Sequence, residues 1–237
     1  MSGRYGDEYS NPNPCPACAT FKWRGAPDKG YFTTWNKEKK EDRIMPLPVK
    51  FLFLDSLSCV NGWSESNKSS IFSNEVKKLS EPLILKIFKD GKVAKFMDGL
   101  YSENKAKFND AGAAFHTSIF CLIKANAEVE DYTLVRLMIK GAALGAWIDK
   151  GFDERDGLVT ILEAEDKQKG VVKYRQPVFG YEESTDEEDE AKAKEAYQKV
   201  QDWYNYDKNG ITDPQPTMKE IKEQFKEKPE VDEDLPF

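Results

Sequence analysis

Alternating apolar and polar residues predict β-strands through the middle of the chain. The expected strands cover residues 49–60, 83–89, 92–97, 114–124 and 132–140. The long loop between the first two, which starts at Asn61-Gly62, has room for a further short strand near residues 71–79. A helical spacing over residues 99–110 separates the third expected strand from the fourth.

Asp90-Gly91 joins two of these strands and favours the positive φ angles of a two-residue hairpin turn. Pairing Lys89 with Lys92 sets a register in which successive side chains fall on two faces. One face is apolar and belongs to the core: Leu83, Leu85, Ile87, Ala94 and Phe96. The other face mixes aromatic, aliphatic and cationic groups: Ile84, Lys86, Phe88, Val93, Lys95 and Met97.

The order of these elements is that of an OB-fold, a five-stranded barrel with a helix between its third and fourth strands. The predicted fold class is therefore mainly β with some α. An Ala-rich turn at residues 141–147 and an extra hairpin, residues 158–165 with 171–179, are expected as additions to the barrel. The OB-fold domain would span residues 49–180.

Two segments of different composition flank this domain. Residues 1–48 carry six prolines among aromatic and basic residues, which predicts an irregular arm. Residues 181–237 open with an acidic run that predicts a solvated helix to about residue 206, capped by Ser184 or Thr185. A short helix over 217–226 and a disordered end over 227–237 are expected beyond it.

The net charge of −7 is unevenly distributed. From Gln176 onward there are 18 Asp and Glu against 8 Lys, whereas residues 1–175 hold 27 Lys and Arg against 24 Asp and Glu. The body is thus +3 and the tail −10. A basic body attracts phosphates, and an acidic tail repels them and can compete for the same surface.

The polar start of the chain, and an apolar stretch that Arg136 and Lys140 interrupt, predict a soluble, unexported protein with no membrane contact. Only four cysteines occur in 237 residues, which is too few for a disulfide scaffold. The expected location is the cytoplasm, or the host cytoplasm if the protein is viral.

Rings and cations alternate in the arm, as a stacking surface over a phosphate track requires. The arm candidates for nucleic-acid binding are Lys22, Trp23, Arg24, Tyr31, Phe32, Trp35, Lys37, Lys39, Lys40 and Arg43. Packing of Trp23 and Trp35 against the barrel is the alternative. The barrel candidates are Lys86, Phe88 and Lys95 on the outer hairpin face, with Trp63 and Lys68 in the first long loop. Phe88 leads, because packing alone explains an aromatic flanked by lysines poorly.

Cys15-Pro-Ala-Cys18 has the spacing of half a zinc site. No second pair follows, and only Cys59, His116 and Cys121 remain as soft ligands. We therefore predict no stoichiometric zinc and no other cofactor, which elemental analysis can test. His116 is expected in the core or at an interface.

The sequence offers little for catalysis. The acidic group of Asp149, Asp153, Glu154 and Asp156 does not match the calcium loop. No P-loop or nucleophile elbow occurs, and one histidine leaves few general bases. We predict that the protein is not an enzyme.

The chain ends in six residues suited to docking: Asp232, Glu233, Asp234, Leu235, Pro236 and Phe237. Phe237 joins a ring to an α-carboxylate, so a pocket with an apolar floor and an Arg at its lip can bind both. Pro236 lowers the ordering cost of docking, and the acidic triplet attracts a basic rim. A solubility device is the simpler alternative.

This peptide closely resembles the C-terminal tip of bacterial single-stranded DNA-binding proteins, Asp-Asp-Asp-Ile-Pro-Phe. Glu233 replaces the second Asp and Leu235 replaces Ile. The resemblance covers the tip alone, since charged helical sequence stands where that family has a Gly- and Gln-rich linker. It implies partners among replication, recombination and repair proteins, and favours a bacteriophage or plasmid protein that carries the host's tip.

The leading hypothesis is a sequence-tolerant single-stranded DNA-binding protein. The second is an adaptor that occupies the tip-binding pocket of host replication factors and never touches DNA. An exposed face of Lys86, Phe88 and Lys95 favours the first hypothesis, and a buried face favours the second. A metal-dependent nuclease, the third, requires carboxylates clustered in a cleft.

Overall fold

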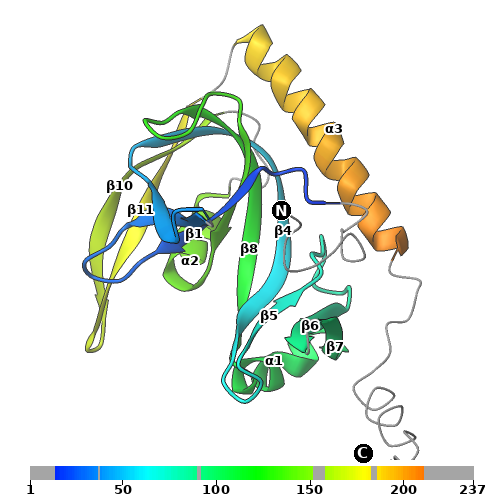
Figure 1. Ribbon diagram of the computed structural model, residues 1–237. Coiled ribbons are helices and arrows are strands. Elements are labelled where there is room, and N and C mark those ends of the chain that lie inside the picture. The colour runs from blue at the N-terminus through cyan, green and yellow to red at the C-terminus, as the bar shows by residue number, and fades with distance from the viewer. Residues whose placement is uncertain (1–13, 37, 90–91, 152–157, 183–185, 211–237) are drawn as a thin grey trace, which may run out of the picture.

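The computed structural model describes residues 14–36, 38–89, 92–151, 158–182 and 186–210. Within them the protein is mainly β, with a curled, open sheet and helices on its surface (Figure 1). The strands are β1 (Ala19–Arg24), β2 (Tyr31–Asn36), β3 (Glu41–Met45), β4 (Val49–Ser64), β5 (Ser69–Ser73), β6 (Leu83–Lys89), β7 (Lys92–Gly99), β8 (Ala113–Ala125), β9 (Leu134–Ile139), β10 (Leu158–Lys169) and β11 (Val172–Glu182). The helices are α1 (Tyr101–Asp110), α2 (Gly141–Lys150) and α3 (Glu187–Gly210).

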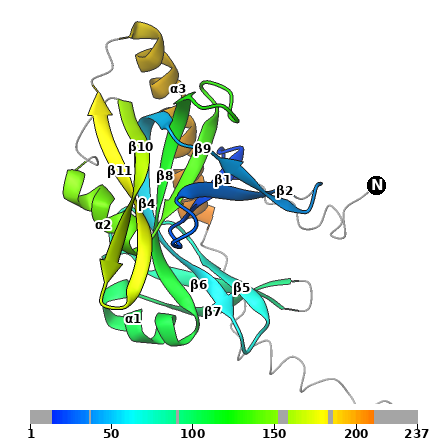
Figure 2. The same cartoon turned by 90° about the vertical axis from the view of Figure 1, so that its left-hand side faces the viewer.

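The strand order is β3-β2-β1-β9-β8-β4-β5-β6-β7. Neighbours are antiparallel except β1 and β9, which are parallel. Strand β4 pairs with β8 along one edge, and divides its other edge between β10 at residues 49–52 and β5 at residues 61–64. The sheet therefore branches at β4 and curls around two separate cores (Figure 2).

The larger core lies inside the curl of β1, β2, β4, β8, β9, β10 and β11. Helix α2 closes it with Trp147, whose ring lies 5.5 Å from Phe53 and 5.4 Å from Phe179 between centroids. The two ends of the curl, β11 and the turn after β1, meet where the Arg175 amide donates a hydrogen bond to the Gly25 carbonyl at 2.9 Å. Burying this many large apolar side chains is what stabilises the curl.

The smaller core lies between α1 and the β5, β6 and β7 strands. It begins where β4 passes β8 at a very short distance: a Cβ on Gly62 would lie 2.0 Å from the Gly112 carbonyl oxygen. Only a residue without a side chain fits there.

Helix α3 covers the opposite face of the sheet. Its Ala196, Val200 and Tyr204 pack on an apolar cluster of β4 and β8 that includes Leu57 and Phe120. Asp189 at its first turn accepts hydrogen bonds from Lys124 at 2.5 Å and from the Tyr132 hydroxyl at 2.8 Å. The acidic helix is thus part of the packed body rather than a solvated tail.

Several expectations are confirmed and others are wrong. The β6–β7 register pairs Lys89 with Lys92, as predicted, and α1 lies between β7 and β8. Residues 1–48 were expected to be irregular, but they contain β1, β2 and β3. The prolines of the described part of this segment lie before, between and after these strands, so they bound them rather than break them. The extra hairpin is also no addition, because β10 and β11 wall the larger core.

Among the described strand pairings, none closes a five-stranded barrel as the predicted OB-fold requires. Strand β9 pairs with β1 on its outer edge instead. The Asp90-Gly91 turn, the Ser184 and Thr185 caps, and the helix and disordered end expected after residue 210 lie outside the described residues.

Candidate nucleic-acid interface

Strand alternation divides the side chains of the sheet between two faces. One face supplies the larger and smaller cores. Its opposite carries α3 at one end, and beyond α3 it carries polar, cationic and aromatic side chains, which we call the polar face. The polar face comprises Thr20, Lys22, Arg24, Tyr31, Trp35, Cys59, Asn61, Trp63, Phe72, Lys86, Phe88, Val93, Lys95, His116, Ser118, Arg136 and Met138, with Lys140 directly after β9.

The β1 and β9 end of the polar face is cationic. Burial lowers the pKa of Lys22, and the neighbouring charges of Arg24, Arg136 and Lys140 lower it further. Burial also lowers the pKa of His116 to about 4, and the charges of Lys140 and Lys22 add to that effect. Mutual repulsion of this kind marks a place where an anion would be stabilised.

The β4, β5 and β6 end is aromatic. Trp63 is 48% exposed and Phe88 is 51% exposed, although both are large apolar side chains. Phe88 lies on Phe72, with ring centroids 5.4 Å apart and the planes tilted by 38°. Lys86 pairs with Phe72 across β5 and β6, which places a cation beside the rings. Exposed rings beside a cation form a surface on which bases can stack.

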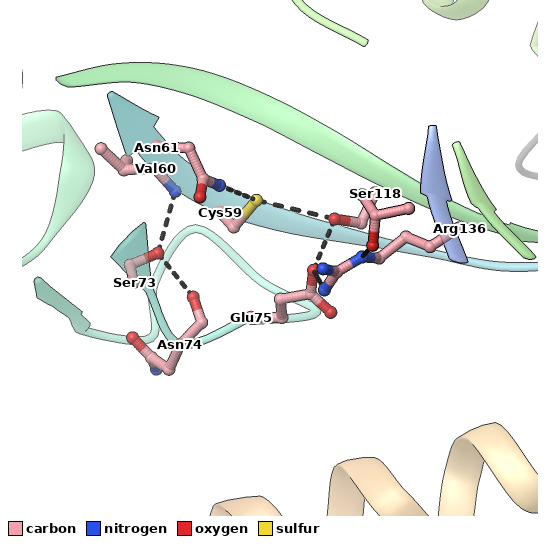
Figure 3. A network of polar contacts seen from close by, with 9 residues as sticks. Cys59, Val60, Asn61, Ser73, Asn74, Glu75, Ser118 and Arg136 are labelled. Atoms are coloured by element: carbon pink, nitrogen blue, oxygen red, sulfur yellow. Dashed lines mark hydrogen bonds and ion pairs between the residues drawn. The ribbon is translucent and has the colours of Figure 1, made fainter. Parts of the chain in front are cut away.

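A buried polar network joins the two ends (Figure 3). Glu75 reaches it from the segment after β5, which is held by paired backbone hydrogen bonds between Val76 and Ser58. Its carboxylate accepts hydrogen bonds from Ser118 at 2.5 Å and from Arg136 at 3.0 Å. Arg136 also donates to Thr20 on β1 at 3.0 Å. The network fixes β1, β8 and β9 relative to one another, so the polar face is preorganised.

The structure separates the predicted arm residues. Lys22, Arg24, Tyr31 and Trp35 lie on the polar face, and Trp35 is 58% exposed. Phe32 is fully buried in the larger core, and Trp23 packs against it edge to face with centroids 5.1 Å apart. The expectation that Phe32 contacts nucleic acid is wrong, because alternate residues of a strand point to opposite faces. Trp23 is partly buried against the larger core, which is the packing alternative.

Other candidates lie at the margins. Arg43 pairs with Thr34 and so lies on the face of β3 opposite to the polar face. Its guanidinium donates to the Glu128 carbonyl. Lys68 lies in the turn after β4, with its ammonium 2.7 Å from Glu65. Lys95 lies on the polar face 2.9 Å from Asp98. These contacts leave Arg43 and Lys68 as weak candidates, while Lys39 and Lys40 are exposed in the β2–β3 turn and Lys37 lies outside the described residues.

Sequence reasoning missed Phe72, Arg136 and Lys140. Strand alternation puts Arg136 on one face of β9, and Lys140 directly after the strand continues that pattern, but nothing in the sequence indicates that β1 lies beside them. Phe72 falls in the short strand expected near residues 71–79, which the structure places at residues 69–73, but the sequence did not indicate that this strand pairs with β6.

The four cysteines differ in their burial. Cys59 and Cys121 are buried, and burial raises the pKa of Cys59 to about 12. Cys15 packs at the α3 cluster and Cys18 is exposed. Among the residues with described positions, no group of three or more His, Cys, Asp or Glu side chains could hold a metal ion. The absence of zinc stays a prediction. Of the acidic residues Asp149, Asp153, Glu154 and Asp156, the first is exposed and the other three lie outside the described residues.

Comparisons with protein-family models, with curated proteins and with solved structures found no match. No helix in the described part of the chain is long and apolar enough to cross a membrane. The docking tip of residues 232–237 lies outside the described residues.

Proposed function

We propose that this protein binds single-stranded DNA through the polar face, without sequence preference and without catalysis, in replication, recombination or repair. The observation that carries the proposal is Phe88, half exposed on an open sheet face with Phe72 beneath it and Lys86 beside it. A half-exposed ring on a sheet costs solvation free energy unless a ligand covers it.

The cationic end supplies the second requirement of the proposal. Lys22 and Lys140 have no ion-pair partner within the described residues, and both act on the pKa of His116. Phosphates would neutralise them, and release of counterions would add to affinity. Rings at one end and cations at the other are what recognition of base faces and backbone requires.

An OB-fold interpretation of the body belongs to the same proposal. Strand β4, helix α1, and the β8–β9 hairpin follow in OB order, and β9 has a parallel neighbour. In this interpretation β1 and the β10–β11 hairpin complete the curl around the larger core. The C-terminal tip would recruit partner proteins, as its resemblance implies.

The adaptor hypothesis predicted that the outer hairpin face would be buried. Of its three residues Lys86 and Lys95 are half-buried, and Phe88 is 51% exposed, so the face is open at Phe88 and this favours the DNA-binding proposal.

The proposal is tested by fluorescence anisotropy with labelled oligo-dT at two salt concentrations. We expect binding at low salt that weakens steeply as salt rises, because phosphate contacts release counterions. No binding at low salt would overturn the proposal and leave the adaptor as the better account.

A further inference from the structure

The β10–β11 hairpin ends in an apolar turn that nothing in the chain covers within the described residues. Lys169 pairs with Val172, so Gly170 and Val171 form a two-residue loop. Gly170 has φ 59°, which suits the first central position of a type II′ turn. Val171 is 96% exposed and Val172 is 61% exposed. Turns of this kind ordinarily carry polar residues, so two exposed valines point to a contact.

Charge at this turn is uniformly positive. Lys167, Lys169 and Lys173 surround the valines, and no Asp or Glu occurs from residue 167 to residue 175. Lys167 lies 2.5 Å from Glu165, whereas Lys169 and Lys173 have no ion-pair partner in the part of the chain that is described. A second copy of the same tip would be repelled, and an anionic backbone would be attracted.

Hydrogen bonds join the hairpin to the β1–β2 turn. Arg175 on β11 donates from Nη1 to the Lys29 carbonyl at 3.0 Å and from its amide to Gly25. Trp23 returns a hydrogen bond from Nε1 to the Arg175 carbonyl at 3.3 Å. The β1–β2 turn, which follows Lys22 and Arg24, is thereby fastened to the hairpin.

A groove marks the junction of the two elements. It has a volume of about 340 Å³ and lies between Pro27 of the β1–β2 turn and the hairpin. The hairpin side is lined by Asp166, Lys167, Gln168, Lys173 and Tyr174. The groove lies between the β1–β2 turn, which follows Lys22 and Arg24, and the β10–β11 hairpin, whose backbone is drawn in Figure 2. Two lysines and a tyrosine of the hairpin line it, and the carboxylate of Asp166, which also lines it, is paired with Arg175.

We propose that the β10–β11 hairpin is a second nucleic-acid contact, in which Lys169 and Lys173 bind phosphates and Val171 packs on a base or sugar. The proposal rests on the proposed function, since it extends the track of a strand already held on the polar face. It implies that a long single strand engages both surfaces, and that a short one is held by the polar face alone.

The test uses the full chain, a short oligo-dT of about six nucleotides and a long one of about twenty, within and beyond the usual range for one fold. The variants are Lys169→Ala with Lys173→Ala, and Val171→Ser. The matched control is Lys105→Ala with Lys107→Ala, two exposed lysines of α1. Affinity is measured by anisotropy from 50 to 200 mM salt.

For the long oligo, removing two phosphate contacts should reduce the slope of log affinity against log salt by about 1.4, since each contributes about 0.7. Over this salt range that equals about a sevenfold smaller loss of affinity than in the wild type. Val171→Ser should weaken long-oligo binding with the slope unchanged, and the control should match the wild type. All variants should bind the short oligo equally.

Unchanged long-oligo binding in both hairpin variants would overturn the hairpin contact and leave the proposed function standing. Failure of the wild type to bind either oligo would instead refute the proposed function, and the hairpin contact with it. If the wild type binds vesicles of anionic phospholipid and Val171→Ser abolishes only that binding, the tip contacts lipid and the proposal is wrong.

Discussion

Phe88→Ala removes the ring on which the proposed site depends. The side chain is 51% exposed and packs on Phe72 with the ring centroids 5.4 Å apart. Truncation therefore removes a tilted aromatic pair but little buried surface. Loss of such a pair costs about 0.5–1.5 kcal/mol of folding free energy. Loss of one base–aromatic stack costs about 1–3 kcal/mol of binding free energy. Affinity for oligo-dT should therefore fall about 5- to 150-fold while the protein stays folded.

Anisotropy with labelled oligo-dT measures the affinity, and urea unfolding measures the fold. Tyr197→Ala is the matched control, because this ring is 41% exposed on α3 and is not one of the residues of the polar face. The control should bind as the wild type does. An affinity of Phe88→Ala equal to that of Tyr197→Ala would show that bases do not stack on Phe88, and the site would have to lie elsewhere.

Three further predictions concern the histidine and the tail. The pKa of His116 is lowered from 6.5 to about 4 by burial, so the unfolded chain takes up a proton first as pH falls. The free energy of unfolding therefore keeps its full value above pH 6.5 and falls by roughly 3 kcal/mol as the pH drops toward 4. Urea unfolding at several pH values should show a smaller fall in His116→Gln. Deleting Leu235–Phe237 should abolish the pull-down of proteins that bind bacterial-type tips, while the affinity for oligo-dT should stay the same. If every partner is still pulled down, the docking function is refuted and the tail acts as a solubility device. Removing residues 211–237, which leaves α3 intact, should strengthen oligo-dT binding at low salt and less so at high salt, and an unchanged affinity would exclude competition by the tail.

Local pattern was enough to predict the β6–β7 hairpin with its register, helix α1, and the exposure of Phe88. In these elements a turn, an alternation or a helical spacing carries the information within a few residues. Residues 1–48 were predicted to be irregular because prolines are frequent there, and because their short strands form only by pairing with distant segments. Strand β1 is completed by β9, more than a hundred residues later, and no local pattern specifies that pairing.

The errors in the candidate site have the same origin. Lys22, Trp23 and Arg24 look like one cluster in a flexible arm, but in a strand the middle residue faces the other way. The same alternation turns Phe32 toward the larger core and Tyr31 toward the polar face. Arg136 and Lys140 join the site only because β1 lies beside β9, so the cationic end could not be predicted from any single segment.

The most direct test of the polar face uses the single histidine of the chain as a reporter. His116 lies on this face, and its pKa of about 4 reflects burial together with the charges of Lys140 and Lys22. A phosphate bound at these lysines would neutralise that repulsion, so the pKa should rise above about 4 in the complex. The measurement is an NMR titration of the His116 imidazole against pH, with and without saturating oligo-dT. A raised pKa with oligo-dT is the predicted result, and an imidazole whose shift and pKa are the same with and without it would contradict binding on the polar face.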